Sequence, residues 1–259
     1  MLPSVFLSHG APTLPLVDVP ARGFLAGLPA LLAERPKAIL VASAHWETER
    51  PMVSAVERND TIHDFYGFPH ALYQLRYPAP GDPALAERIS DMLCDAGLES
   101  ALDRGRGLDH GAWVPLLVAW PQADIPVLAL SVQSRLGPAH HLQLGQALAK
   151  LRGEGVLVIG SGSFTHDLRR FRGQPLDAPE PPDVAAFAGW ITAALLEGRR
   201  CDLLTYRHKA PHAADNHPTE EHLLPLFVAL GAGGEGAKAR LLHRSGAYGI
   251  IRMDAFAFE

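Results

Sequence analysis

The sequence predicts a single α/β domain with a mostly parallel central sheet flanked by helices. Apolar runs of strand length alternate with amphipathic stretches of helical length, a pattern typical of parallel strands joined by helices. Apolar residues make up 47% of the 259 residues and charged residues 20%, which is enough apolar material for one large core. No internal repeat or low-complexity tract divides the chain. We therefore expect residues 1–259 to form a single domain.

The first half of the chain contains four predicted strands and three predicted helices. The strands are apolar runs at 4–8, 37–45, 52–57 and 125–132. The helices have amphipathic or apolar periodicity and cover 24–35, 83–97 and a stretch that starts after Gly111 and ends near Pro121. Residues 58–83 are rich in aromatics, Pro and Gly and have no clear periodicity. A loop of this length in one domain is commonly functional, so we expect it to form a wall of the site.

The second half continues the alternation. Helices are predicted at 138–155, 181–198, 201–208 and 223–231, and strands at 156–166, near 239–244 and within 248–258. The segment GAGGEG is rich in glycine, but it follows a helix rather than a strand. Because a dinucleotide-binding loop joins a strand to a helix, this segment does not predict a dinucleotide site.

Charge and cysteine content exclude several classes of protein. The net charge of -5 offers no basic surface for nucleic acid or anionic lipid. The two cysteines, Cys94 and Cys201, are far apart, so neither a disulfide framework nor a thiolate zinc site is expected. The N-terminus lacks the pattern of a signal peptide, and no apolar run is long enough to span a bilayer. We expect a soluble, cytoplasmic protein with no nucleic-acid or membrane partner, and the oligomeric state stays open.

Three of the thirteen histidines follow apolar strands: His9, His45 and His166. The carboxyl ends of parallel strands meet at one edge of the sheet, where open α/β sheets bind their ligands. Neutral imidazole is a common ligand of zinc and iron, and a catalytic metal needs about three protein ligands with a position left open. The alternative for each histidine alone is a ring satisfied by backbone groups. Small residues nearby would leave room for an ion or a substrate: Ser8, Gly10, Ala42, Ser43, Ala44, Gly160, Ser161 and Gly162.

Further candidates lie outside the strand ends. His110 follows Asp109, a carboxylate that could orient the imidazole or simply cap the next helix. The segment NHPTEEH offers four residues that could complete a metal site or, for the two glutamates, favour the positive end of a helix; they are His217, Glu220, Glu221 and His222. Spacing does not choose among them.

The remaining histidines are weaker candidates. The long loop holds a possible aromatic substrate pocket, or else an ordinary packed loop, at His63, Asp64, Tyr66 and His70. His140 and His141 stand at the start of a predicted helix, where we expect exposure to solvent.

Seven short motifs, taken in order, carry a family resemblance: SHGAPT, SAHWE, TIHDFYGFP, YPAPGDP, LDHGAW, GSGSFTHDL and PTEEHLLPL. In these motifs, and over nearly its whole length, the chain resembles the class III (LigB-type) extradiol ring-cleavage dioxygenases, in the branch called DOPA 4,5-dioxygenase. The resemblance implies an α/β protein that binds one divalent non-haem metal per chain. That metal is iron(II) in active members and often zinc(II) in crystals of bacterial members.

The resemblance also implies roles for individual residues. His9 and His45 match the first two metal ligands, and His222 matches the third. Protocatechuate-cleaving relatives use a glutamate there, so Glu221 is the alternative ligand. A sphere of three histidines departs from the two-histidine, one-carboxylate set usual for iron(II) oxygenases and leaves the native metal open. His166 matches the acid/base residue, which could also approach the metal, and His110 matches a second active-site histidine.

The implied reaction inserts dioxygen into a catechol, DOPA or a related one, to give a muconic semialdehyde. His166 would take a proton from the bound catechol and later return it, and His110 would stabilise charged oxygen. The expected partners are therefore a small aromatic diol and O2. The rival interpretations are a zinc hydrolase that uses the same histidines to activate water, and a non-enzymatic homologue that binds a metal or another ligand.

Overall fold

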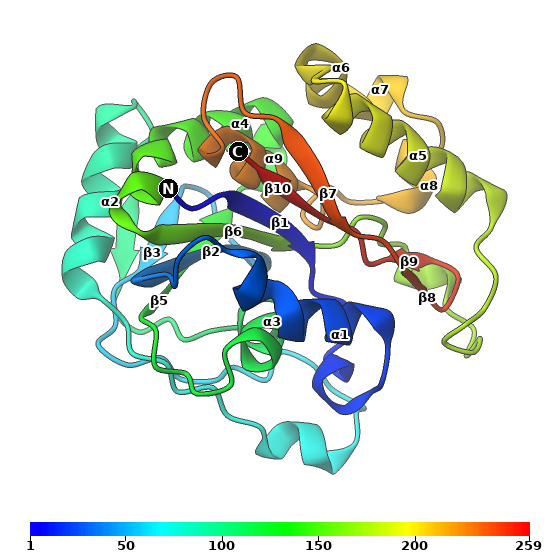
Figure 1. Ribbon diagram of the computed structural model, residues 1–259, viewed down its shortest axis with the longest axis horizontal. Helices are drawn as coiled ribbons and strands as arrows, with labels where there is room; N and C mark the ends of the chain where they lie inside the picture. The colour runs from blue at the N-terminus through cyan, green and yellow to red at the C-terminus, as the bar shows by residue number, and fades with distance from the viewer.

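The seven predicted strands and one short strand that was not predicted, Ala101–Asp103, form one eight-stranded sheet in the order β4-β3-β5-β2-β6-β1-β10-β7. The computed structural model describes residues 1–259 (Figure 1). The strands of this sheet are β1 (Ser4–Ser8), β2 (Ala38–Glu47), β3 (Met52–Ser54), β4 (Ala101–Asp103), β5 (Val127–Val132), β6 (Val156–Gly162), β7 (Ala239–His243) and β10 (Ala255–Phe258). A second, two-stranded sheet pairs β8 (Gly246–Ala247) with β9 (Ile251–Arg252).

The middle of the large sheet is parallel and its margins are antiparallel. Strands β5, β2, β6 and β1 run parallel to one another, whereas β10 pairs antiparallel with β1 and with β7, and β3 pairs antiparallel with β5. The mostly parallel α/β fold predicted from the sequence is confirmed. A parallel centre places the carboxyl ends of β1, β2 and β6 at the same edge.

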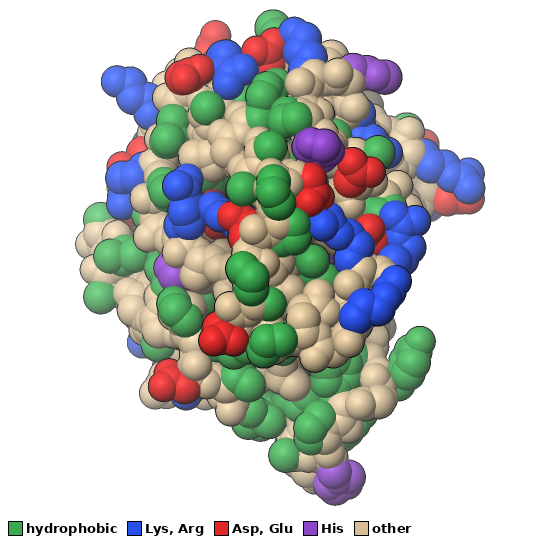
Figure 2. Space-filling view, turned by 90° about the vertical axis from the view of Figure 1, so that its right-hand side faces the viewer, with side chains coloured by type: hydrophobic (Ala, Val, Ile, Leu, Met, Phe, Trp, Pro, Cys, Tyr) green, Lys and Arg blue, Asp and Glu red, His purple; other side chains and the backbone are tan.

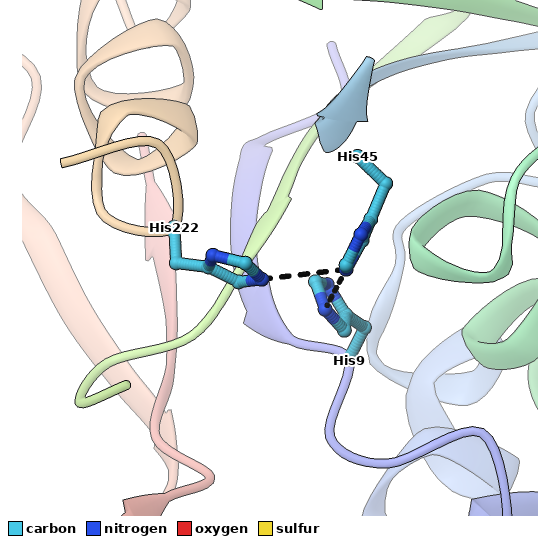
Figure 3. Close-up of side chains that lie close together, drawn as sticks. All are labelled: His9, His45 and His222. Carbon is cyan, nitrogen blue, oxygen red and sulfur yellow. Dashed lines mark hydrogen bonds between the residues drawn. The ribbon is translucent and has the colours of Figure 1, made fainter. Parts of the chain in front are cut away.

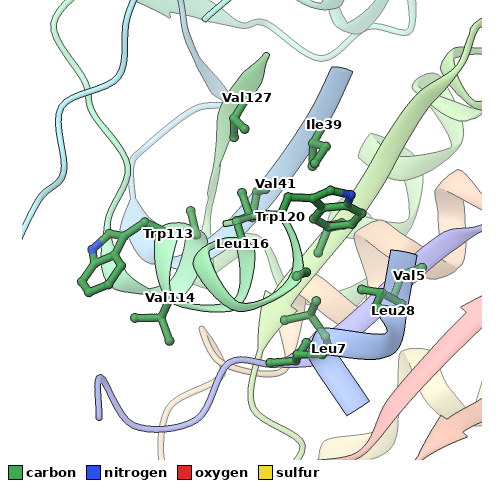
Figure 4. Close-up of a cluster of buried hydrophobic side chains, with 14 of the residues drawn as sticks. Val5, Leu7, Leu28, Ile39, Val41, Trp113, Val114, Leu116, Trp120 and Val127 are labelled. Carbon is green, nitrogen blue, oxygen red and sulfur yellow. The ribbon is translucent and has the colours of Figure 1, made fainter. Parts of the chain in front are cut away.

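Alternate residues of the central strands face two different cores. In β2, Ile39 and Val41 face one core, and Leu40 and Ala42 face the other. The first core packs helix α3 (His110–Ala119) against the sheet, and Trp113, Leu116 and Trp120 are among the buried side chains of this core (Figure 4). Because both faces are covered, the central strands are apolar throughout rather than alternating between apolar and polar residues.

Helices lie on both faces of the sheet. One face carries α1 (Pro20–Gly27) and α3 (His110–Ala119). The other carries α2 (Pro83–Asp95), α4 (Gly137–Ala147), α5 (Pro182–Leu196) and α9 (Leu224–Ala232). Three short helices, α6 (Arg200–Leu204), α7 (Tyr206–Lys209) and α8 (Ala213–Asn216), connect α5 to the turn before α9. None of the helices is long and apolar enough to cross a membrane.

Three predicted helices have different bounds in the structure. The helix predicted at 24–35 starts earlier, at Pro20, and gives way to a 3-10 turn at Leu28–Leu31 that contains Pro29. Proline is accepted in the first turn of a helix but cannot supply an N–H within it, which accounts for both ends. The helix predicted at 138–155 changes to a 3-10 helix after Ala147, and the one predicted at 201–208 divides into α6 and α7.

One histidine expected on the surface is buried instead. The His141 side chain is fully buried, with its Nδ1 atom 2.7 Å from the Gly137 carbonyl and its Nε2 atom accepting a hydrogen bond from the Gln133 backbone N–H at 3.0 Å. His140, its neighbour, is half-buried and contacts the Gln133 side chain at 2.9 Å. The expectation of exposure was wrong for His141 because its ring packs against the start of α4 and the residue after β5, where both of its nitrogens are hydrogen-bonded.

Candidate metal centre and active site

Three imidazoles from distant parts of the chain meet at the carboxyl edge of the sheet. The Nε2 atom of His45 lies 3.0 Å from Nε2 of His9 and 3.3 Å from Nε2 of His222 (Figure 3). One nitrogen from each ring lies within 4.8 Å of the other two. His9 directly follows β1, His45 is near the end of β2, and His222 is in the turn before α9.

Two glycines allow the turn that carries His222 to approach the sheet. A Cβ atom on Gly162 would lie 2.1 Å from the His222 carbonyl oxygen, and one on Gly160 would lie 2.0 Å from the Pro225 carbonyl oxygen. These glycines were expected to leave room for an ion or a substrate. They leave room for the backbone before and within α9 instead, and thereby bring His222 to the end of β6.

Hydrogen bonds on the outer side of the centre fix which nitrogen of two rings faces it. Ser161 Oγ donates to the Gly111 carbonyl, so it accepts from His9 Nδ1 at 3.1 Å. Glu221 accepts from His222 Nδ1 at 2.9 Å. In both rings the proton therefore sits on Nδ1 and the lone pair of Nε2 points into the centre, as is usual for histidines that bind metals.

Burial keeps these imidazoles neutral. Burial, with a contribution from neighbouring histidines, holds the pKa of His9 and His222 well below its ordinary value. Burial and the proximity of His110 lower the pKa of His45 to about 3, against an opposing effect of Asp64. Neutral rings have a free lone pair at neutral pH, the form that binds a metal ion.

The donor set fits a divalent metal. His9 and His222 both turn an Nε2 lone pair towards Nε2 of His45, which has at most one proton to donate, so a metal ion is the partner that all three nitrogens can share. Nitrogens bound about 2.1 Å from a common ion at angles between about 90° and 109° lie roughly 3.0 to 3.4 Å apart. The two closest separations in the cluster fall in this range.

His166 and His110 border the same cavity beside different members of the cluster. The His166 ring stacks on His222 with centroids 3.4 Å apart, and burial lowers its pKa to about 4. The His110 ring lies 3.9 Å from the His45 ring, centroid to centroid. Both histidines line the cavity.

Asp64 holds His110 in place at two points. One carboxylate oxygen accepts from the His110 backbone N–H and the other from Nδ1, both at 2.9 Å, and the second oxygen is also 3.6 Å from His45 Nδ1. Burial raises the pKa of Asp64, but the hydrogen bonds from His110 outweigh this effect and lower it to about 2. The carboxylate is therefore ionised and orients a ring at the centre.

Asp109 caps helix α3 and does not orient the His110 imidazole. Its side chain caps α3 by accepting from the Ala112 N–H at 3.2 Å, and it also binds Ser43 Oγ and Arg106. It makes no hydrogen bond to the neighbouring His110 ring. A carboxylate 46 residues away in the sequence orients that ring instead.

A cavity of about 390 Å³ opens beside the histidines, within the range of small-molecule sites. Several of its lining residues were not predicted as site residues. Thr13, Phe65, Phe68 and Phe171 lie in irregular segments, Leu168 is in a short 3-10 helix, and Tyr248 and Ile251 belong to the predicted strand region 248–258. For Phe65 and Phe68, the sequence offered one indication of a place in the site: both are close to Asp64 in the long loop.

The three residues predicted to bind substrate, His63, Asp64 and Tyr66, do not line the cavity. Tyr66 is 92% exposed and does not line the cavity. His63 lies behind Phe65 and contacts the Leu75 carbonyl at 3.1 Å, and Asp64 binds His110 rather than facing the cavity. The segment they belong to does form a wall of the site, but Phe65 and Phe68 supply the contacts.

Comparisons with known proteins agree with this arrangement. Residues 3–254 match the family described as the catalytic LigB subunit of aromatic ring-opening dioxygenase. The 4,5-DOPA dioxygenase extradiol of Beta vulgaris is 49% identical over 256 residues, which cover 98% of this chain and 95% of the relative. The Escherichia coli K12 protein of the same name is 40% identical over 235 residues, covering 89% and 85%. A crystal structure of an uncharacterized protein from Escherichia coli K12 has a TM-score of 0.81 and 32% identity over 100% of both chains.

The chain therefore belongs to the LigB family of aromatic ring-opening dioxygenases. Within this metal-dependent family it is an extradiol ring-cleavage dioxygenase.

Proposed function

We propose that this dioxygenase opens a catechol ring beside one hydroxylated carbon, with one divalent metal held by His9, His45 and His222. The convergence of their three Nε2 atoms supports this ligand set. Iron(II) is the metal we assign to the active enzyme, and zinc(II) suits the same nitrogens. Glu221 binds His222 Nδ1 and so supports the third ligand rather than replacing it.

The metal, when bound, supplies Lewis acidity for the two catechol oxygens and a position for dioxygen. His166 is the base: its pKa of about 4 leaves the ring neutral, with a lone pair free to accept a proton from a catechol hydroxyl. The same ring then holds that proton close to the product oxygens and can return it.

His110 stabilises negative charge on oxygen. Asp64 accepts a hydrogen bond from His110 Nδ1–H and fixes the orientation of the ring. With Nδ1 engaged in this way, Nε2 is the nitrogen left to interact with an oxyanion in the cavity.

The substrates of this reaction are an aromatic diol and O2. Several relatives are named for DOPA, a catechol with a side chain on the ring. A cavity of about 390 Å³ accommodates a catechol ring with a short substituent.

Oxygen uptake tests the proposal. The protein is loaded with iron(II) without air and then mixed with aerated buffer and a catechol. We expect oxygen consumption in a 1:1 ratio with catechol and a yellow product absorbing in the visible range. Uptake without any ring-opened product, or no uptake with any catechol at full iron occupancy, would contradict it.

A further inference from the structure

One segment of the chain leads from the histidine centre out to the mouth of the cavity. His166 stacks on His222 at the inner end of this segment. Leu168 and Phe171 come next, and both line the cavity although their side chains are 53% and 45% exposed, respectively. Lining residues that are this exposed lie where the cavity meets solvent. Arg172, which directly follows Phe171 and is exposed, therefore lies beside the cavity mouth.

Arg172 differs from the other two arginines of this segment in having no carboxylate partner. Arg169 binds the Asp167 carboxylate at 2.8 Å. Arg170 binds both carboxylate oxygens of Asp183, at 2.6 and 3.1 Å. The guanidinium of Arg172 donates only to backbone carbonyls. It is therefore the cation of this segment that is available to an anionic group from outside the protein.

The hydrogen bonds of Arg172 leave one edge of its guanidinium free. Its Nη1 atom donates to the carbonyls of Arg169 and Phe171, whereas Nε and Nη2 make no hydrogen bond within the protein. Two N–H groups on one edge of a guanidinium can bind a carboxylate through two parallel hydrogen bonds. The backbone here is also fixed, because the Gln174 side-chain oxygen accepts from the Arg172 N–H at 2.6 Å. The binding edge is thus held in place and unoccupied by protein groups.

The surface around the segment carries several positive side chains. Figure 2 shows the face that includes the loop between β6 and α5 and the strands β8 and β9, which lie on the right in Figure 1. Lys and Arg side chains gather on part of this face, with acidic side chains between them and an area of hydrophobic side chains below. The mixture agrees with the pairing of Arg169 and Arg170 to carboxylates, which leaves Arg172 as the unpaired cation.

We propose that Arg172 binds a carboxylate at the end of the substrate's ring substituent, so that the enzyme prefers catechols that carry such a carboxylate. This inference rests on the proposed catechol cleavage. An ion pair between two freely moving exposed groups is weak. Here the catechol is already bound through its two oxygens and the guanidinium is held through Nη1, so the pair forms with little further loss of freedom.

Matched pairs of catechols test the assignment. 3-(3,4-Dihydroxyphenyl)propionate and its primary amide have nearly the same size and shape but differ in charge. DOPA and its primary amide differ in the same way, and both keep the ammonium group. Two quantities are measured for each compound: kcat/KM of the iron(II) enzyme, and the Kd of the zinc(II)-loaded protein by calorimetry. The second quantity needs no turnover.

We expect the wild-type protein to prefer each acid over its amide by about tenfold in both quantities. Arg172→Gln removes the charge and the paired N–H groups, so we expect the acids to lose this advantage while the amides behave as in wild type. Arg172→Lys keeps the charge but not the paired geometry, and it should retain part of the preference. An unchanged preference in Arg172→Gln would overturn the inference.

Two other arginines separate a direct contact from the general charge of the surface. Arg169→Gln removes a cation from the same segment, and Arg135→Gln removes an exposed one from the 3-10 helix after β5, outside the cavity. We expect the preference for acids to persist in both, and a loss in Arg169→Gln as large as that in Arg172→Gln would refute a direct contact.

The two measurements also distinguish this inference from the proposed reaction. If the acids bind more tightly than the amides, and only while Arg172 is present, but no catechol is cleaved, then catechol cleavage fails and the carboxylate site stands. Equal cleavage of acids and amides by the wild-type enzyme refutes the carboxylate site alone.

Discussion

The centre assigns different tasks to chemically identical side chains by their neighbours. His9 and His222 donate a hydrogen bond from Nδ1–H to Ser161 and Glu221, respectively. Each ring therefore presents the lone pair of its Nε2 atom to the centre. The ring of His166 makes no hydrogen bond to a carboxylate or a hydroxyl group, and it stacks on the ring of His222. The first kind of ring is suited to hold an ion, and the second is free to exchange a proton.

Single alanine substitutions should separate these tasks. His9→Ala or His45→Ala removes a nitrogen donor, so we expect metal content after desalting to fall to a small fraction of wild type. His166→Ala leaves the three nitrogens in place, and we expect it to retain metal and lose turnover by on the order of a hundredfold to ten-thousandfold. Elemental analysis and kcat measure the two effects. His70→Ala, at an exposed position, is the control; full metal occupancy in both ligand variants would refute the assignment.

Asp64 should act through His110 rather than through the metal. In Asp64→Asn the amide can still accept from the backbone, but its NH2 group faces the Nδ1–H of His110, so the ring loses its orientation and its preferred tautomer. We expect kcat to fall by roughly a hundredfold with metal content nearly unchanged, and the pH profile of kcat to shift. Asp60→Asn changes an exposed carboxylate of the same loop and serves as the comparison. A variant with normal kcat and pH profile would show that Asp64 has no positioning role.

At the scale of elements, close backbone contacts at glycines place α9 against the sheet and against α4. Gly160 and Gly162 of β6 contact the backbone around the start of α9. Further along, a Cβ atom on Gly145 of α4 would lie 2.1 Å from the Val228 carbonyl oxygen of α9. The position of His222 therefore depends on packing between elements as well as on its own turn.

Alanine at these glycines should distinguish packing from metal binding. Gly162→Ala forces the His222 carbonyl away, so we expect it to lower the free energy of unfolding by about 1 to 3 kcal/mol and to weaken metal binding. Gly145→Ala forces apart α4 and α9 and should lower stability by a similar amount with metal affinity retained. Gly189→Ala, in α5 with open space around its Cβ, should be neutral or slightly stabilising. Urea unfolding and metal titration measure both quantities. Equal metal affinity in Gly162→Ala and Gly145→Ala would show that Gly162 does not position His222.

The parts of the site that the sequence predicts are those governed by local patterns. Apolar runs ending in His9 and His45 predict strand ends at one edge, because parallel strands align their carboxyl ends. Whether His217, Glu220, Glu221 or His222 completes the centre depends on how a turn packs over β6, so that residue came from the family resemblance alone. The partner of His110 is equally non-local, since the nearby Asp109 caps the helix and Asp64 reaches the ring from another loop.

At the scale of the whole molecule, local sequence patterns predict the fold but not the cavity. Alternation of strands and helices predicts the layered α/β architecture, which depends on burying both faces of the sheet. Cavity-lining residues such as Phe65, Leu168 and Phe171 come from irregular segments or a short 3-10 helix, so their meeting depends on tertiary structure and leaves no periodic trace. Composition predicts a large core but not which histidines it contains, as His141 shows.

Buried neutral histidines make the stability of the whole fold depend on pH. Burial lowers the pKa of His141 to about 4, and its Nε2 atom accepts a backbone N–H bond that a proton would abolish. The unfolded chain binds a proton near pH 6.5, so between pH 6.5 and about 4 it holds more protons at this site than the folded chain does. Stability therefore falls as pH falls through this window, by about 2 kcal/mol between pH 7 and 5 for one such residue.

Replacing His141 should reduce this dependence. His141→Gln loses hydrogen bonds and will be less stable at pH 7, but the readout is the change between pH 7 and 5 in urea unfolding at fixed saturating metal. We expect that change to be smaller than in wild type by about 2 kcal/mol, since glutamine does not titrate. His70→Gln removes an exposed imidazole, and its change with pH should match wild type. If His141→Gln also matches wild type, the buried ring of His141 does not couple folding to protonation, and the acid sensitivity must come from other groups, such as the buried His217, whose pKa is also lowered to about 4.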